Sequence, residues 1–588
     1  MTAFRMFAAA AIAFGCSSSV LAEPRPPFPL EVRPELRWRL PAAALCEGLR
    51  ELTWADGSRI ASAAVVPANA TTRVPRHCAV RGIATPTSDS IITFEVLIPF
   101  DGTSYRRRYL QLGNGGFSGG IPRDQLIYGL QRGYAAAATD DGNQVPQSPA
   151  FVVGHPEKVI DYGHRSLKQT NDKAKDVIAT LMGARPERSY FEGCSNGGRQ
   201  ALMVAQRYPA DFDGIIAGAP ANYFTHQFAS FAWNAQKIYA PGATVSSLRA
   251  SSVSVLSNEV GRQCAGRDGG LGTDRYLTNP LLCRVNLAPI TCAAGASTAS
   301  CLTPVEAGIV RDLYAGPVHA VSGAQIFPGL EPGAEDHAFN WGPWITGPVG
   351  ASPFSLQALY GGGFFGAFVN NTTAPFDVRP MNVSAAIDEA DARFAEVLNS
   401  TDADLRAFRD RGGKLIQYHG FDDAAVAPKN SINYWASVDA RMRAVRPGVS
   451  RTTVSDFYRL FMVPGLGHCF GGDGANVLLG DPVTGARLDA GHDLYAAIER
   501  WVEAGEAPSR LIASHLVGTA VTFQRPVCPY PAMPAFNGSG NPADAANWSC
   551  RIAKLVPFKP KLFRERLFKL PVPPDPSPLR TRLPVQRR

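Results

Sequence analysis

The segment Tyr190-Phe191-Glu192-Gly193-Cys194-Ser195-Asn196-Gly197-Gly198 has the pattern of a buried strand that delivers a serine into a sharp turn before a helix. This arrangement is typical of a nucleophile elbow. Gly193 and Gly197 leave room for the backbone to crowd Ser195, and residues 199–208 have a helical pattern that ends before a proline. Because glycine-rich turns often contain a serine by chance, this interpretation requires a base, an orienting acid and an oxyanion hole elsewhere in the chain.

Strand and helix patterns alternate on both sides of this segment. The strand patterns occupy residues 91–99, 108–112, 134–139, 190–193, 214–218, 414–418 and 458–463, and the helical patterns occupy residues 168–182 and 493–502. Such alternation is typical of a parallel sheet that is covered by helices on both faces. We therefore predict an α/β fold with a doubly wound, mostly parallel sheet.

A long interruption separates the two groups of strand patterns. Between residues 223 and 401 the alternation disappears, and four cysteines, many glycines and an aromatic stretch at 339–368 take its place. We predict a core of residues 23–222 and 402–550 that is interrupted by a large insertion at residues 223–401.

The two ends of the chain differ from this globular part. Residues 1–22 combine an arginine, a short apolar run and a small-residue cleavage pattern, which predicts a secretory signal peptide and a periplasmic or extracellular location. No later run approaches the ~18 apolar residues of a transmembrane helix. Residues 551–588 form a basic, proline-rich tail. We expect this tail to be solvated or to contact an anionic surface, and we expect no nucleic-acid partner for an exported protein.

The cysteine content supports export. Removal of the signal peptide takes away Cys16 and leaves ten of the eleven cysteines. Ten cysteines can pair completely in an oxidising compartment, and their spacings match no zinc motif. We therefore expect five disulfides.

A histidine near the C-terminal end of the core is the predicted base for Ser195. Catalytic side chains of a doubly wound sheet lie on loops at the carboxyl ends of strands. The loop after residues 458–463 contains His468 between glycine and cysteine, so it can bend toward the serine. His468 would accept the serine proton as general base. His419, at the end of the strand at 414–418, is a weaker candidate.

Two adjacent aspartates can orient the histidine. Asp422 and Asp423 both follow the strand at 414–418. Either side chain can fix the tautomer of His468 and stabilise its protonated form, and spacing alone does not decide between them. The chain order Ser, Asp, His is that of α/β-hydrolases.

Two cysteines flank the proposed catalytic residues. Cys194 precedes Ser195, and Cys469 follows His468. A disulfide between them requires their Cα atoms to lie within about 7 Å of each other, which would hold nucleophile and base together. The alternatives are that both cysteines pair elsewhere or that Cys194 is an unreactive thiol in the core.

The glycine-rich stretch at 113–120 is the predicted second half of an oxyanion hole. One of the two convergent N–H groups comes from the residue after the nucleophile, which is Asn196. The other is expected from Gly116 or Gly115, in the loop that follows the strand at 108–112. The same stretch lacks the G-K-[ST] of a phosphate-binding loop, which disfavours nucleotide binding.

Six segments, taken in order, resemble the tannase and feruloyl esterase family of secreted α/β-hydrolases, which includes mono-hydroxyethyl-terephthalate hydrolases. They are GNGGFSGG at 113–120, GCSNGG at 193–198, FDGIIAGAPA at 212–221, WITG at 344–347, RGGKLIQYHGFDD at 411–423 and GLGHC at 465–469. The resemblance covers most of residues 45–550. It implies an α/β-hydrolase fold, a serine carboxylic-ester hydrolase, and a lid domain formed by the insertion at 223–401.

The resemblance also implies roles for individual residues. Family members usually read H-G-x-x-D after the corresponding strand, which selects Asp423 as the catalytic acid. The family joins its catalytic serine and histidine through the neighbouring cysteines, which agrees with a bond between Cys194 and Cys469. It further implies the pairs Cys46–Cys78, Cys264–Cys283, Cys292–Cys301 and Cys528–Cys550.

A structural calcium site is another family property, and this sequence supplies it incompletely. The family pattern is C-D-x-x-D-G-x-x-D-G-x-I, whereas this chain has Ala265 in place of the first aspartate and a loop two residues longer. Asp268 and Asp274 remain as oxygen donors, but calcium takes six to eight. The chemistry itself is expected to require no cofactor.

The insertion is expected to select the substrate. Its aromatic residues can clamp an aromatic ring or can form the insertion's own core, and the candidates for the clamp are Trp344, Phe364, Phe365 and Phe368. No Lys or Arg occurs between residues 312 and 378, so this stretch offers no cation to a substrate carboxylate.

We therefore predict a secreted esterase that acts through an acyl-enzyme on small esters of phenolic acids such as ferulate or gallate, free or attached to plant polymer. Terephthalate-type monoesters and transacylation are the alternatives for an enzyme. A catalytically silent binding protein on the same fold is the alternative from another class, although all three triad residues are present.

Overall fold

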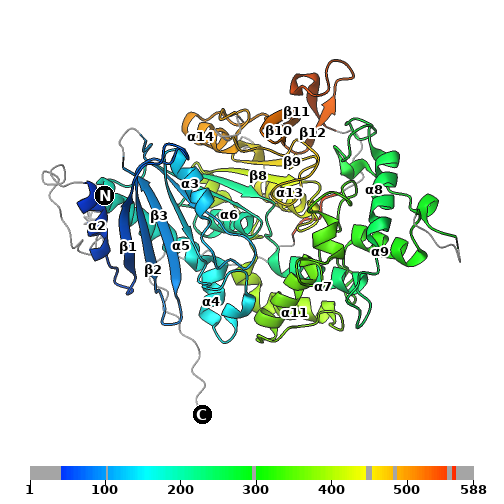
Figure 1. Ribbon diagram of the computed structural model, residues 1–588, viewed down its shortest axis with the longest axis horizontal. Helices are drawn as coiled ribbons and strands as arrows, with labels where there is room; N and C mark the ends of the chain where they lie inside the picture. Colours follow the sequence, from blue (N-terminus) through cyan, green and yellow to red (C-terminus); the bar gives the residue numbers. More distant parts are fainter. Residues whose placement is uncertain are drawn as a thin grey trace, which may run out of the picture. The chain divides into compact units, whose positions relative to one another are not determined.

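A nine-stranded mixed sheet forms the centre of the computed structural model, which describes residues 42–100, 104–293, 300–444, 453–480, 487–552 and 559–563. The strands lie in the order β1-β2-β3-β5-β4-β6-β7-β8-β9 (Figure 1). Their bounds are β1 (Arg59–Val66), β2 (His77–Ala84), β3 (Ile92–Pro99), β4 (Arg108–Leu112), β5 (Tyr134–Thr139), β6 (Arg188–Cys194), β7 (Gly214–Gly218), β8 (Lys414–Gly420) and β9 (Tyr458–Val463). β1, β2, β3 and β5 pair antiparallel, and all neighbours from β5 to β9 are parallel.

The parallel strands are continuously apolar because both of their faces are covered. β7 is buried at every position, and β8 is buried at every position except its first. This is the pattern expected of parallel strands inside an α/β sheet. The edge strand β1 is half exposed, and its mixture of small and charged residues carries no clear strand pattern. The predicted α/β class is therefore confirmed, with an antiparallel extension that the sequence analysis did not predict.

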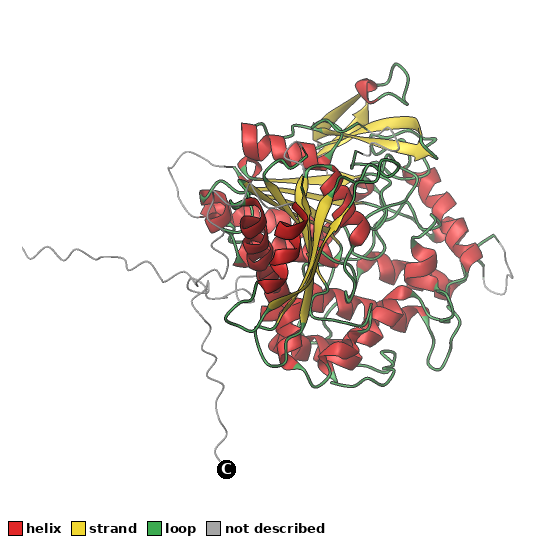
Figure 2. Ribbon diagram, turned by 60° about the vertical axis from the view of Figure 1, so that its left-hand side comes forward, coloured by secondary structure: helices red, strands yellow, loops and turns green. Residues whose placement is uncertain are grey.

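Helices cover both faces of the sheet (Figure 2). α3 (Arg123–Gln131) and α14 (Leu494–Ala504) share one apolar cluster with the strands. α5 (Ser166–Met182), α6 (Asn196–Arg207) and α13 (Lys429–Ala444) contribute to a second cluster, which lies on the opposite face. The sheet is thus doubly wound, as predicted.

Residues 223–401 are helical and lie between β7 and β8 in the chain, although these two strands pair directly, with Gly214 opposite Lys414. Most of the apolar side chains of this insertion join one cluster, which also includes core residues such as Phe117, Tyr162 and Ala424. Its helices, drawn in green in Figure 1, are α7 (Phe224–Ile238), α8 (Ala250–Cys264), α9 (Pro304–Ala315), α10 (Leu356–Gly363) and α11 (Val383–Leu398), with the short helical turns η6 (Gly342–Thr346) and η7 (Phe364–Val369). α12 (Arg406–Asp410) leads back into β8.

Short elements complete the described part of the chain. They are α2 (Ala42–Gly48), α4 (Pro156–Ile160), the hairpin of β10 (Leu511–Val517) and β11 (Ala520–Val527), and the hairpin of β12 (Ala532–Phe536) and β13 (Trp548–Ile552). Within the described ranges, no helix is long and apolar enough to cross a membrane. The predicted signal peptide lies outside these ranges, as does the tail except for residues 551, 552 and 559–563.

Five disulfides join the ten cysteines that remain after residue 22. They are Cys46–Cys78, Cys194–Cys469, Cys264–Cys283, Cys292–Cys301 and Cys528–Cys550. These are the five pairs that the sequence analysis expects.

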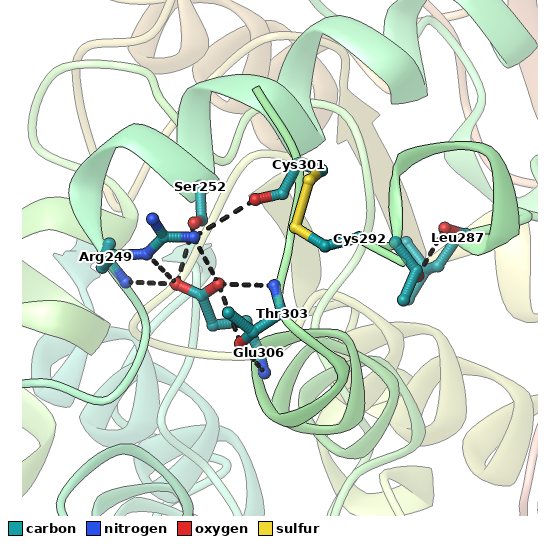
Figure 3. Close-up of a disulfide and its surroundings, with 8 residues drawn as sticks. Arg249, Ser252, Leu287, Cys292, Cys301, Thr303 and Glu306 are labelled. Carbon is teal, nitrogen blue, oxygen red and sulfur yellow. Dashed lines mark hydrogen bonds and ion pairs between the residues drawn. A yellow bond between two sulfur atoms is a disulfide. The ribbon is translucent and has the colours of Figure 1, made fainter. Parts of the chain in front are cut away.

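A buried carboxylate fastens α9 to the segment before α8, next to the disulfide Cys292–Cys301 (Figure 3). Glu306 accepts hydrogen bonds from Nε and Nη2 of Arg249, both at 2.8 Å, and from the hydroxyl of Ser252 at 2.8 Å. It also accepts from the backbone N–H of Thr303 at 2.8 Å, which closes a capping box at the start of α9. Burial opposes ionisation, but these donors lower the pKa of Glu306 to about 2.

Replacing Glu306 with glutamine should destabilise the insertion in a pH-dependent way. The Glu306→Gln variant should lose about 1 to 3 kcal/mol of unfolding free energy at pH 7, because the donors of Arg249 lose an ionised acceptor. The folded-state pKa is lowered, so this contribution exists above the ordinary carboxyl pKa and disappears as pH falls toward 2. The difference from wild type, measured by urea unfolding, should therefore shrink between pH 5 and pH 3.

Glu389→Gln is the matched control, because Glu389 forms an exposed ion pair with Arg393 on α11. Such pairs contribute about 0 to 1 kcal/mol. Equal destabilisation by the two substitutions would contradict the structural role of Glu306.

Candidate active site

Ser195 lies in a strained turn between β6 and α6. Its backbone has φ 65° and ψ −121°, a conformation that residues with a side chain rarely adopt. The turn is held by a hydrogen bond from the N–H of Ser195 to the carbonyl of Gly218, at 3.0 Å. A Cβ atom on Gly193 would lie 2.6 Å from the backbone of Gly197, so position 193 requires glycine, whereas a Cβ atom on Gly197 would lie 3.1 Å from the backbone oxygen of Asn114. The chain therefore makes the sharp turn that the segment at 190–198 predicts.

A chain of hydrogen bonds connects Ser195 to the predicted base and acid. Nε2 of His468 lies 2.8 Å from Oγ of Ser195, and Nδ1 of His468 lies 2.8 Å from Oδ2 of Asp423. This geometry lets His468 accept the serine proton while Asp423 holds the imidazole in the tautomer that presents Nε2.

The surroundings of Asp423 keep it ionised. Burial by itself would raise its pKa, but His468 and His419 hold the pKa well below its usual range. Nε2 of His419 lies 3.1 Å from Oδ2, and the backbone N–H groups of Ala425 and Val426 donate to Oδ1 at 2.8 Å. His419 is thus a second partner of the acid, and the contacts of its ring lie with Asp423, Val426 and Ser431.

The structure distinguishes the two aspartates that spacing left undecided. Asp423 contacts His468, whereas the carboxylate of Asp422 lies 3.2 Å from Nδ1 of His337, a residue of the insertion. The choice of Asp423 therefore agrees with the geometry, and Asp422 has a different partner that the sequence analysis did not consider.

The disulfide Cys194–Cys469 joins the serine turn to the histidine loop. The two Cα atoms lie 6.0 Å apart, although 275 residues separate the cysteines in the chain. Cys194 ends β6, and Cys469 follows His468 with a positive φ of 67°. Since each cysteine is adjacent to one partner of the 2.8 Å contact, the disulfide limits how far Ser195 and His468 can separate.

The predicted oxyanion donors line the same cavity as Ser195. Asn196, Gly115 and Gly116 all face this cavity. Among the hydrogen bonds of the described residues, none uses the N–H of these three residues, while the side chain of Asn196 accepts from Nε of Arg199 at 2.7 Å. Gly116 has a positive φ of 56°, which favours glycine at this loop position, and a Cβ atom there would lie 2.0 Å from the side-chain oxygen of Gln147.

The cavity has a volume of about 580 Å³, and six aromatic rings contribute to its wall together with glycines and polar side chains. Trp344 of η6 lies edge-on against His468, with ring centroids 5.3 Å apart, and stacks on Tyr360 of α10. The aromatic rings that line the cavity are Phe224, Phe228, Phe231, Trp344, Tyr360 and Phe470.

Three of the four predicted clamp residues are not at this wall. Phe364, Phe365 and Phe368 are almost completely buried in the apolar cluster of the insertion and do not line the cavity. Their burial reflects the turn η7, which packs all of its side chains inward. The alternative that these rings form the insertion's core is therefore correct, and Trp344 alone of the four faces the cavity. Phe224, Phe228 and Phe231 of α7 line the cavity but were not predicted to do so. Their spacing of three or four residues, which is typical of one face of a helix, was the sequence signal that could have identified them.

One carboxyl group lines the cavity and was overlooked in the sequence. Glu192 lies on β6, three residues before Ser195, and is buried. Its carboxylate accepts from the hydroxyl of Tyr495 at 3.3 Å, and burial raises the pKa of Glu192 to about 7. The described lining contains no Lys or Arg.

The residues of the expected calcium loop do not suit a calcium ion. Asp268 uses its two oxygens to accept the backbone N–H groups of Gly270 and Asn279, at 3.1 and 3.0 Å. Asp274 accepts the N–H of Leu271 at 3.2 Å, and the guanidinium of Arg525 lies 3.8 Å from its other oxygen. The described chain holds no group of three or more His, Cys, Asp or Glu side chains placed to bind a metal. An arginine thus supplies positive charge beside these carboxylates.

Comparison with known proteins agrees with this geometry. The family model described as tannase and feruloyl esterase matches residues 78–551. An uncharacterized esterase from Xanthomonas campestris pv. campestris is 36% identical over 538 residues, which cover 87% of this chain and 91% of that protein. Mono(2-hydroxyethyl) terephthalate hydrolase from Piscinibacter sakaiensis is 30% identical, with coverage of 87% and 92%.

The fold of this chain also resembles that of a solved structure. The crystal structure of feruloyl esterase B from Aspergillus oryzae matches with a TM-score of 0.77 at 27% identity, and the match covers 87% of this chain and 100% of that chain. The family match includes both groups of core strands and the insertion between them. The chain therefore belongs to the tannase and feruloyl esterase family, has its α/β-hydrolase fold, and is a carboxylic ester hydrolase.

Proposed function

We propose that this esterase works through an acyl-enzyme on Ser195. The observation that carries the proposal is the chain of two 2.8 Å contacts from Ser195 through His468 to Asp423. His468 takes the proton from Oγ as Oγ attacks the ester carbonyl carbon. The tetrahedral intermediate then collapses, and the leaving alkoxide takes that proton from His468 and departs as the alcohol.

Water completes the cycle by the reverse sequence of proton transfers. His468 takes a proton from water as the water oxygen attacks the acyl carbon, and it returns this proton to Oγ of Ser195 as the carboxylic acid leaves. In both halves the N–H groups of Asn196 and of Gly116 or Gly115 stabilise the negative oxygen. No step uses a metal or a cofactor.

The cavity favours an ester of an uncharged aromatic acid, such as ferulate or gallate. Its aromatic wall, with Trp344 beside His468, suits a phenolic ring. An acid with a second carboxylate would meet Glu192 and no cation in the described lining. The Piscinibacter relative named for a terephthalate monoester keeps such a substrate as the competing candidate.

We also propose that the protein is exported from the cell. The pattern of residues 1–22 is that of a signal peptide, and five disulfides are stable in an oxidising compartment. An exported esterase of this kind would meet phenolic esters that are free or attached to plant polymer. The insertion at 223–401 would act as the lid over the active site, and the basic tail would contact anionic surfaces.

The nucleophile can be tested by active-site labelling. A fluorescent serine-directed phosphonate should label the wild-type protein once per chain and fail to label Ser195→Ala. Hydrolysis of methyl ferulate should fall at least about 10⁴-fold in this variant, because the group that forms the acyl-enzyme is missing. Ser251→Ala, an exposed serine on α8, should behave like wild type. Labelling of Ser195→Ala at the wild-type rate would disprove the proposal.

Substrate charge can be tested through Glu192. We expect the ratio of kcat/KM for methyl ferulate to that for mono(2-hydroxyethyl) terephthalate to rise by roughly tenfold as pH passes about 7, since ionised Glu192 repels the second carboxylate. Tyr495 and Tyr418 are the other titratable groups close to Glu192, and both stay uncharged in this range because burial raises their pKa.

The Glu192→Gln variant should lose this pH dependence and should hydrolyse the terephthalate ester relatively better. Glu389→Gln, outside the cavity, should retain it. A ratio that is independent of pH in the wild type would show that Glu192 does not select the substrate.

Metal independence is a separate expectation. Incubation with EDTA should leave both the Tm and the hydrolysis rate unchanged, because the donors around Asp268 and Asp274 are already engaged. Arg525→Gln should lower stability by about 1 to 3 kcal/mol, and added calcium should not restore it. Arg500→Gln, from an exposed ion pair, should have little effect. A Tm that drops with EDTA and recovers with calcium would contradict this account.

A further inference from the structure

A histidine of the insertion lies between the two loops that carry the catalytic acid and base. His337 precedes η6, and its side chain is only 1% exposed. Nδ1 lies 3.2 Å from Oδ2 of Asp422, and Nε2 donates to the carbonyl of Arg275 at 2.9 Å. Nε2 also lies 3.5 Å from the carboxylate of Asp473. The ring therefore connects the insertion to Asp422 on one loop and to Asp473 on the other.

The partners of this ring favour a state in which it carries two protons. A backbone carbonyl accepts hydrogen bonds and cannot donate, so Nε2 of His337 must be protonated to bind Arg275. Nδ1 faces a carboxylate that is almost completely buried, and an ion pair there needs a proton on Nδ1 as well. Burial opposes this charge, but Asp422 and Asp473 raise the pKa of His337 to about 9.

The two loops that His337 contacts are the catalytic ones. Asp422 immediately precedes Asp423, and its N–H donates to the carbonyl of Leu466 at 3.0 Å, two residues before His468. Asp473 lies four residues after Cys469, on the continuation of the histidine loop. The same stretch of the insertion places Trp344 edge-on against His468. One segment of the insertion thus contacts Asp422, which is next to the acid Asp423, and Asp473, which lies on the loop of the base His468.

We propose that His337, as a buried imidazolium, is a positioning residue. It holds the loops of Asp423 and His468 in fixed positions relative to each other and to the insertion. The proposal rests on the proposed roles of Ser195, His468 and Asp423. His337 itself contacts no reacting atom, so its effect must appear in kcat rather than in substrate affinity.

Several charged groups surround His337 and influence the pH at which it loses its proton. Asp422 comes from the loop after β8, Asp473 from the histidine loop, and Glu335 from the same loop of the insertion. Arg275 contributes its carbonyl to His337, and its guanidinium lies 3.1 Å from Asp473. Because the folded-state pKa of His337 is raised above its usual value, the interaction is complete below about pH 6.5 and is lost as pH rises through about 9.

The test measures kcat and KM for methyl ferulate between pH 6 and pH 10 in wild type, His337→Gln and Asp422→Asn. We expect kcat of the wild type to fall as pH passes about 9. Both variants should have at least tenfold lower kcat at pH 7.5 with KM changed less than threefold, and neither should show the fall near pH 9. The double variant should be no worse than the poorer single variant, because the two residues act as one unit.

His319→Gln is the matched control. His319 also belongs to the insertion and also faces an aspartate, Asp388, at 3.2 Å, but that aspartate is exposed to solvent. The control should keep wild-type kcat within twofold and the same fall near pH 9.

Near-UV circular dichroism establishes that each variant is folded, and Asp422→Asn decides the question if His337→Gln does not fold. A folded His337→Gln or Asp422→Asn protein with kcat within twofold of wild type would overturn the proposal. So would a wild-type profile that is flat through pH 9. Failure of the serine mechanism is distinguished separately, because Ser195→Ala would then remain active.

Discussion

The 2.8 Å contact between His468 and Ser195 depends on a covalent constraint. The two residues come from the two chain segments that form the core, and a 179-residue insertion lies between them at 223–401. The disulfide Cys194–Cys469 holds the Cα atoms of the two neighbouring cysteines 6.0 Å apart, next to the reacting groups. Strand pairing brings the loops to one edge of the sheet, and the disulfide limits the remaining freedom. The histidine loop can therefore be rich in glycine and still present its side chain in one place.

The parts of the fold that were predictable are those whose residues are buried by the sheet itself. Strands β3 to β9 are continuously apolar or alternate regularly, and they were located from sequence within a few residues. β1, β2 and the two C-terminal hairpins were missed, because β1 and β11 expose many of their residues and the mostly buried β2 contains His77, Arg81 and Gly82, which interrupt an apolar pattern. The insertion was recognised only by the loss of alternation. Its helices pack against one another in a cluster that no periodic pattern of the core predicts.

For the site as well, some residues could be predicted from the sequence and others could not. Ser195 and His468 follow from local turn chemistry and strand ends, so the residues alone identify them as candidates. The choice of Asp423 needed the family pattern, and the geometry agrees because Asp422 pairs with His337 across the insertion. The aromatic wall was mostly misassigned. Which face of η7 or α7 points into a cavity is decided by packing against distant helices, and composition does not contain that information.

The order of the catalytic residues along the chain has a consequence for biosynthesis. Ser195 leaves the ribosome 273 residues before His468, with the whole insertion in between. At roughly 5 to 20 residues per second, a nascent chain spends on the order of 15 to 50 seconds with the proposed nucleophile and without the proposed base. The growing polypeptide would therefore lack the proposed base until about four-fifths of its 588 residues have been made. Under the proposed mechanism, products truncated before His468 would be inactive whatever their stability.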